Sequence, residues 1–112
     1  MTNVEYGKIL HWIGRNMKPT NKINESHTSY GLKDMCEKDL DTYISNDDFK
    51  SVMGNMGYAE FASYTQGNPY YKFKFTSESE KLSYDLSLSE ITESELNFEI
   101  ELNKEEKILR GK

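Results

Sequence analysis

Apolar residues recur at helical spacing in three stretches of the first half of the chain. The first stretch runs from Val4 to Met17 and follows Thr2, which is suited to cap a helix. It ends before Pro19, whose ring keeps the preceding residue out of the helical region. This pattern predicts a helix from Asn3 to Asn16.

The segment Thr28 to Tyr58 has the pattern of two short amphipathic helices joined by a tight turn, which is typical of a helix-turn-helix. Thr28 or Ser29 caps the first of these helices, and its expected inward residues are Leu32, Met35, Cys36 and Leu40. Ser45 begins the second helix, and Gly57 is suited to a left-handed position after its end. Its apolar stripe consists of Phe49, Val52, Met53 and Met56.

Alternating apolar and polar residues predict strands in the second half of the chain, at Ala59 to Tyr64 and at Tyr70 to Thr76. The same alternation continues at Leu82 to Leu88 and at Leu96 to Leu102. The polar segment from Lys18 to His27 is interpreted as a loop.

These elements predict an α+β fold with three N-terminal helices, helix-turn-helix or winged-helix-like, followed by a small antiparallel sheet of three to four strands. We expect a single domain over residues 1–112, which is a usual domain size. Its helical part would be 1–58, its strands would occupy 59–103, and 104–112 would form a charged tail.

The charge is unevenly distributed along the chain, whose net charge is -5. Residues 1–33 carry +3, residues 34–48 carry −5, residues 49–76 carry +2 and residues 77–112 carry −5. A basic excess is typical of a surface that contacts nucleic acid, and here it is concentrated in the first third of the chain. No segment has the length of a membrane span or the pattern of a secretory signal, so we expect a cytoplasmic protein without a membrane partner.

The basic segment and the third helix offer possible contacts for nucleic acid. Lysines and an arginine would bind phosphates, and asparagines and a lysine on the third helix would face base edges in the major groove. The candidates are Arg15, Lys18, Lys22, Lys33, Asn46, Lys50 and Asn55. Asp47 and Asp48 in the first turn of that helix would repel phosphates, and a solvated loop is the alternative interpretation of the basic segment.

Carboxylates near the C-terminus offer a second candidate surface, because a row of them imitates phosphates and fits a basic nucleic-acid channel. The candidates are Glu90, Glu93, Glu95, Glu99 and Glu101. Pairing of Glu99 and Glu101 with Lys72 and Lys74 across strands, or simple solubility, is the alternative.

Catalysis has little support in the sequence. His11, His27 and the single cysteine Cys36 form no metal-binding spacing, and no phosphate-binding or nucleophile motif is present. We therefore expect a protein that is not an enzyme and uses no cofactor or metal.

The segment KPTNKINESHTSYGLKDMCEKDLDTYISNDDFKSVMGNMGY, from Lys18 to Tyr58, resembles a recurring block in small proteins of phages and conjugative elements of Gram-positive bacteria. The block carries no assigned activity and covers about a third of the chain. By size, charge and this setting, the chain is also similar in kind to anti-CRISPR inhibitors of Cas9-type effectors. That similarity is an analogy without a contact motif.

Two main hypotheses follow. The first is a non-enzymatic inhibitor encoded by a mobile genetic element, which binds a host nucleic-acid-processing protein such as a Cas nuclease through the acidic surface. The alternative is a winged-helix DNA-binding regulator or replication accessory protein, and a structural adaptor is a third class. The sequence leaves the oligomeric state open, including a homodimer.

Overall fold

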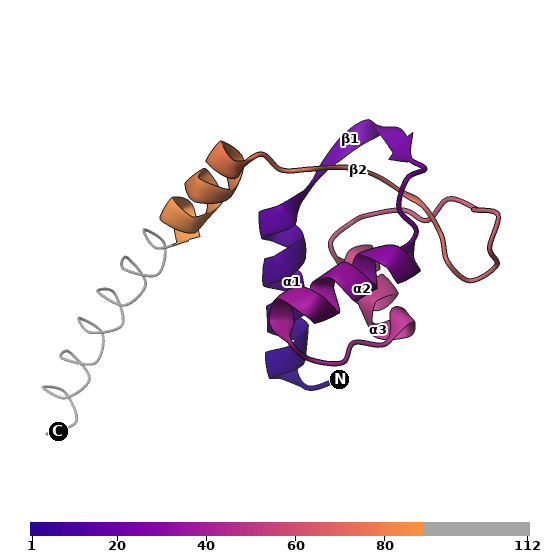
Figure 1. Ribbon diagram of the computed structural model, residues 1–112, viewed down its shortest axis with the longest axis horizontal. Coiled ribbons are helices and arrows are strands. Elements are labelled where there is room, and N and C mark those ends of the chain that lie inside the picture. The colour runs from indigo at the N-terminus through magenta and orange to yellow at the C-terminus, as the bar shows by residue number, and fades with distance from the viewer. Residues whose placement is uncertain (89–112) are drawn as a thin grey trace, which may run out of the picture. The chain divides into compact units, whose positions relative to one another are not determined.

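The computed structural model describes residues 1–88 of the 112-residue chain. The chain divides into two units, 1–77 and 78–112, and each is described by itself. The first unit contains three helices and two strands in the order α1, β1, α2, α3, β2, and the three helices lie on one side of the two strands (Figure 1). Of the second unit, residues 78–88 are described and are helical.

Helix α1 spans Asn3–Asn16, which confirms the predicted bounds. Its start is fixed by a capping box, in which the Thr2 hydroxyl accepts from the Glu5 N–H at 3.1 Å and the Glu5 carboxylate accepts from the Thr2 N–H at 3.2 Å. The helix buries Ile9, Trp12 and Ile13.

Helices α2 (Ser29–Leu40) and α3 (Asn46–Asn55) begin at capping hydroxyls of Thr28 and Ser45, as their sequences predict. Helix α2 ends at Asp41, which adopts a left-handed conformation with φ 50°. Gly57, with φ 95°, follows the end of α3, where the Tyr58 N–H donates to the Met53 carbonyl at 3.1 Å. The two amphipathic helices and the turn between them are therefore confirmed.

Strands β1 (Met17–Asn24) and β2 (Tyr71–Phe75) form a two-stranded antiparallel sheet within the described residues. Met17 lies opposite Phe75, Lys18 opposite Lys74 and Pro19 opposite Phe73, and the register shifts between Pro19 and Asn24. A single bridge outside the strands joins Phe61 to Tyr70 through two backbone hydrogen bonds of 2.9 and 2.8 Å.

The predicted order of three helices followed by three to four strands is wrong. A strand, β1, lies between the first two helices, where the loop from Lys18 to His27 was expected. Its sequence shows no alternation, and its structure comes from pairing with β2 about fifty residues later. The expected strand from Ala59 to Tyr64 is reduced to the bridge at Phe61.

The expected strand from Leu82 to Leu88 is also wrong, because residues 78–88 are helical. Leu82 and Leu86 are separated by four residues, as are Tyr84 and Leu88, so the same sequence fits one helical turn as well as strand alternation. The expected strand from Leu96 to Leu102 lies outside the described residues. The predicted strand at Tyr70 to Thr76 is confirmed as β2.

The core of the first unit combines all three helices with both strands. Trp12 connects α1 to the other helices, because its indole N–H donates to Asp39 at 2.7 Å and its ring packs edge-on against Phe49 at 6.2 Å between centroids. Met35, an expected inward residue, is 37% exposed. The buried apolar residues are Ile9, Trp12, Ile13, Met17, Leu32, Cys36, Ile44, Phe49, Val52, Met53, Tyr71 and Phe73.

None of the helices in residues 1–88 is both long and apolar enough to cross a bilayer.

Candidate functional site

Four lysines of the two strands form a basic surface, which we call the lysine face: Lys18, Lys22, Lys72 and Lys74. Lys18 and Lys74 lie directly opposite each other, so their side chains point to the same side of the sheet. Lys72 precedes Lys74 by two residues and shares that side, while Tyr71 and Phe73 point into the core. Neither strand contains an acidic residue.

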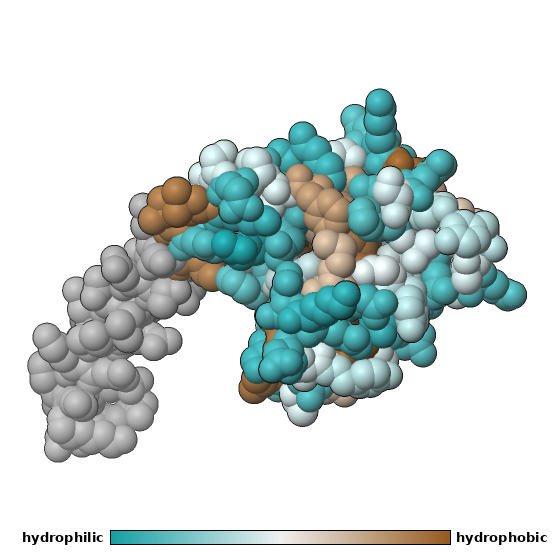
Figure 2. Space-filling model, in the orientation of Figure 1, coloured by the Kyte–Doolittle hydropathy of each residue, from teal (hydrophilic) through white to brown (hydrophobic). Residues whose placement is uncertain are grey.

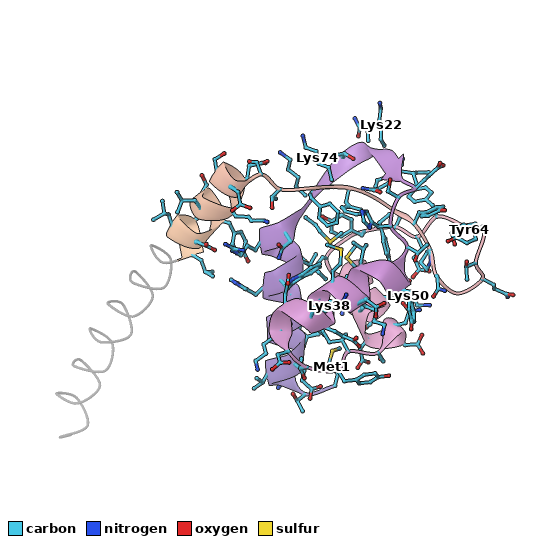
Figure 3. The ribbon with its side chains drawn as sticks, viewed as in Figure 1. Met1, Lys22, Lys38, Lys50, Tyr64 and Lys74 are labelled. Carbon is cyan, nitrogen blue, oxygen red and sulfur yellow. The ribbon has the colours of Figure 1, made fainter. Side chains whose placement is uncertain are left out.

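Lys22 and Lys74 together line an open groove of about 370 Å³, which also includes Thr20, Asn24 and Glu25. Both side chains extend away from the body of the unit (Figure 3), and the strand region shows hydrophilic side chains beside apolar surface in the same view (Figure 2). Among residues 1–88, no carboxylate forms an ion pair with Lys22, Lys72 or Lys74. Their charges therefore remain available to an anion from outside.

The lysine face ends at an aromatic residue. The Lys72 ammonium lies 5.0 Å from the centre of the Phe61 ring, within the range of a cation–π contact. Phe61 also belongs to the wall of an adjoining pocket, so it links the lysine face to the segment that follows α3.

This adjoining pocket, which we call the loop pocket, has a volume of about 520 Å³. It is formed by the 60–69 segment together with Lys50 of α3. Tyr64 lies on the segment at the right of Figure 3 and is 88% exposed. The full lining is Lys50, Glu60, Phe61, Ala62, Ser63, Tyr64, Thr65, Gln66, Gly67 and Pro69.

Hydrogen bonds within the 60–69 segment hold its shape. The Ser63 hydroxyl donates to the Asn68 carbonyl at 2.6 Å and accepts from the Thr65 N–H at 3.0 Å. The Asn68 N–H donates to the Thr65 carbonyl at 3.2 Å, and Gly67, between these two residues, has φ 83°. The pocket is therefore built from an ordered turn.

Asn46 and Lys50, two sequence candidates for base contacts, hold this segment from α3. The Asn46 amide donates to the Gly67 carbonyl at 3.2 Å and to the Asn68 side chain at 2.9 Å, and its oxygen accepts from the Ser29 hydroxyl at 2.9 Å. The Lys50 ammonium donates to the Gly67 carbonyl at 3.1 Å. An amide with all these bonds has little capacity left for a base edge.

Lys33, another sequence candidate, is buried within the helix pair. Its ammonium lies 3.0 Å from Asp34 and 3.2 Å from Glu37, and Glu37 also accepts from the Ile44 N–H at 2.9 Å. Burial alone would lower the pKa of Lys33, but the hydrogen bonds and charges of Asp34 and Glu37 outweigh it and raise that pKa. Lys33 is 7% exposed, and its ammonium pairs with the carboxylate that holds the α2–α3 turn.

The remaining nucleic-acid candidates belong to α1 and α3. Arg15 is in the last turn of α1, and Asn55 is the exposed last residue of α3. Asp47 and Asp48 occupy the first turn of α3, as expected, and Asp47 has a side chain that is 93% exposed. The acidic candidates Glu90, Glu93, Glu95, Glu99 and Glu101 lie outside the described residues.

No cluster of three or more possible metal ligands occurs in the part of the chain that the structure describes. Cys36 is fully buried, and burial together with Asp39 and Glu37 raises the pKa of its thiol to about 12. A thiol in this state is a poor nucleophile at neutral pH.

No protein-family model, curated protein or solved structure matches the chain. The function is therefore inferred from the arrangement of this chain's own residues.

The strand lysines Lys72 and Lys74 are functional candidates that the sequence indicates only as cross-strand partners for Glu99 and Glu101. The signal was present in the segment YKFKF, where lysines alternate with aromatic residues and one side of a strand must be basic. Their alignment with Lys18 was not visible, because β1 was expected to be a loop.

Proposed function

We propose that this protein binds nucleic acid through the lysine face, as a regulator or accessory protein. The observation that carries the proposal is the direct opposition of Lys18 and Lys74, with Lys22 and Lys72 on the same small sheet. Lys22, Lys72 and Lys74 have no ion pair among residues 1–88, so this surface attracts a ligand that supplies negative charge.

The charge of the first unit supports a localised interface. Residues 1–77 contain nine cationic and nine anionic side chains, so the unit as a whole is neutral. Its cations are enriched on the strands, while six of its anions fall between Asp34 and Asp48 on the helix pair. A phosphate backbone is therefore attracted to one side of the unit and repelled from another.

Binding of labelled oligonucleotides by the full chain at low salt tests the proposal. The Lys72→Gln/Lys74→Gln variant should bind more weakly, and the slope of log affinity against log salt should fall by about 1.4 to 1.8 for two lost phosphate contacts. The matched control is Lys8→Gln/Lys38→Gln, which removes two exposed lysines from the helices. Absence of binding to both duplex and single strands would refute the proposal, as would an equal effect of both variants.

A second proposal keeps the inhibitor hypothesis, and the charge of residues 78–112 supports it. This segment has ten carboxylates and five cations, a net charge of −5, whereas residues 1–77 are neutral. Such an inhibitor of a host nucleic-acid-processing protein would act through the acidic candidates, so Glu99→Lys/Glu101→Lys should weaken binding to a basic nuclease. Unchanged inhibition by the folded variant would exclude this mechanism.

A further inference from the structure

The loop pocket adjoins the lysine face through a shared residue. Phe61 lines the pocket, and its ring also lies under the Lys72 ammonium at 5.0 Å. The bridge between Phe61 and Tyr70 fixes the start of the loop to the residue before β2. A chain that follows the lysines toward Phe61 therefore arrives at the pocket.

The pocket has the size and chemistry of a nucleobase site. Its volume of about 520 Å³ lies in the usual range for small ligands, about 300 to 1,000 Å³. Phe61 and Tyr64 supply aromatic surface, and Thr65 and Gln66 supply a hydroxyl and an amide group beside the carboxylate of Glu60. Aromatic side chains beside a basic track are the usual means of binding unpaired bases.

The pocket is held in its shape before any ligand binds. Asn46 and Lys50 fix the Gly67 carbonyl, and Ser63 ties Thr65 to Asn68. Tyr64 projects from this fixed turn and is 88% exposed, although a tyrosine ring normally buries much of its surface. An exposed ring on a rigid support loses little entropy when a base stacks on it.

We propose that the nucleic acid is single-stranded, with its backbone along the lysine face and one unstacked base in the loop pocket against Tyr64 and Phe61. A duplex keeps its bases stacked inside, so it can use the lysines but not the pocket. This inference rests on the proposed function and specifies its ligand. Its chemistry is shared by single-stranded DNA and RNA.

Fluorescence anisotropy with the full chain tests the inference. The probes are labelled oligothymidylate and oligouridylate of about 12 nucleotides, and a DNA duplex of equal length, at about 50 mM salt. A fourth probe is a DNA strand of equal length whose sugars carry no bases. Both base-carrying single strands should bind more tightly than the duplex, and the baseless strand should lose that advantage.

The decisive variant is Tyr64→Ala, whose exposed side chain makes no contribution to the core. It should weaken binding of the base-carrying single strands by roughly 5- to 150-fold, the usual effect of losing one stacked base, and leave duplex and baseless-strand binding unchanged. The matched control is Tyr43→Ala, which removes a ring that is 82% exposed at the α2–α3 turn. Circular dichroism establishes that each variant is folded.

The outcomes separate the two proposals. Equal binding of all four probes, or an equal loss from Tyr64→Ala and Tyr43→Ala, would overturn the base site and leave the lysine face intact. No binding to any probe would overturn both. Tight binding of a polyglutamate peptide, together with no binding of any probe, would show that the lysine face takes acidic protein instead of nucleic acid.

Discussion

The lysine face and the α2–α3 helix pair are both rich in charged and polar residues, but they use them differently. In the helix pair, Lys33 pairs with Glu37, and Asn46 bonds to Ser29 and Asn68. On the lysine face, Lys74 has no ion pair among the described residues. Charge alone therefore does not mark an interface, because a charged group satisfied inside the fold has little to offer a partner.

The largest expected effect comes from the core of the helix pair. Phe49 is fully buried and packs against Trp12, so Phe49→Ala should lower the free energy of unfolding by about 3–5 kcal/mol. Lys74→Gln, on the exposed lysine face, should change it by less than about 0.5 kcal/mol. Urea denaturation measures both. Similar losses of unfolding free energy in the two variants would contradict the distinction between a structural helix pair and an exposed binding surface.

Glu37 tests whether the helix pair uses its charges internally. Its carboxylate accepts from both the Lys33 ammonium and the Ile44 N–H, so Glu37→Ala should cost about 1–3 kcal/mol of stability. Glu37→Gln retains an acceptor for Ile44 and should cost less. Thermal unfolding monitored by circular dichroism measures the difference. A Glu37→Ala variant as stable as the parent would show that Lys33 does not depend on this pair.

The helices were predictable because their signals are local. Thr2 as the cap, the apolar spacing from Val4 and the stop before Pro19 predict the bounds of α1 correctly. Strand β1 was not predictable, because its sequence MKPTNKIN lacks alternation and becomes a strand only through β2. Residues 78–88 were wrongly predicted to be a strand, because their apolar residues fit both the alternation of a strand and the spacing of a helix.

The candidate site was only partly predictable for the same reason. Lys18 and Lys22 were identified by charge, but their neighbours Lys72 and Lys74 come from a segment about fifty residues away. Asparagine is a residue type that binds base edges, so Asn46 was a reasonable candidate. The neighbouring sequence does not reveal that its amide is hydrogen-bonded to Gly67 and Asn68. The functional surface depends on long-range pairing, which local patterns do not encode.

Alkaline pH should destabilise the helix pair through Cys36. Its thiol has a pKa raised to about 12 in the native protein, but it ionises above about 9 once unfolded. The native state then holds more protons than the unfolded state, so stability is complete below pH 9 and falls above it, by at most about 1.4 kcal/mol per pH unit. Urea denaturation at pH 7, 9 and 10 measures the decline.

The control for this prediction is Cys36→Ala. This variant should be less stable at pH 7, because it leaves a cavity, but its decline between pH 9 and 10 should be shallower. Burial also raises the pKa of Tyr71, so some decline remains in the variant. Equal slopes in parent and variant would contradict the assignment to Cys36.

The smallest expected effect lies on the lysine face and has a sign opposite to the others. Lys74→Glu places a carboxylate directly across from Lys18, which converts a like-charge pair into an opposite-charge pair. The free energy of unfolding should therefore rise by about 0.2–1 kcal/mol, while oligonucleotide binding at low salt should weaken. The control is Lys38→Glu on α2, which should neither raise the free energy of unfolding nor weaken oligonucleotide binding. A Lys74→Glu variant that is more stable but binds oligonucleotides more weakly would show that these lysines lower the stability of the fold in order to bind a ligand. A Lys74→Glu variant that is less stable would show that Lys74 has a structural role.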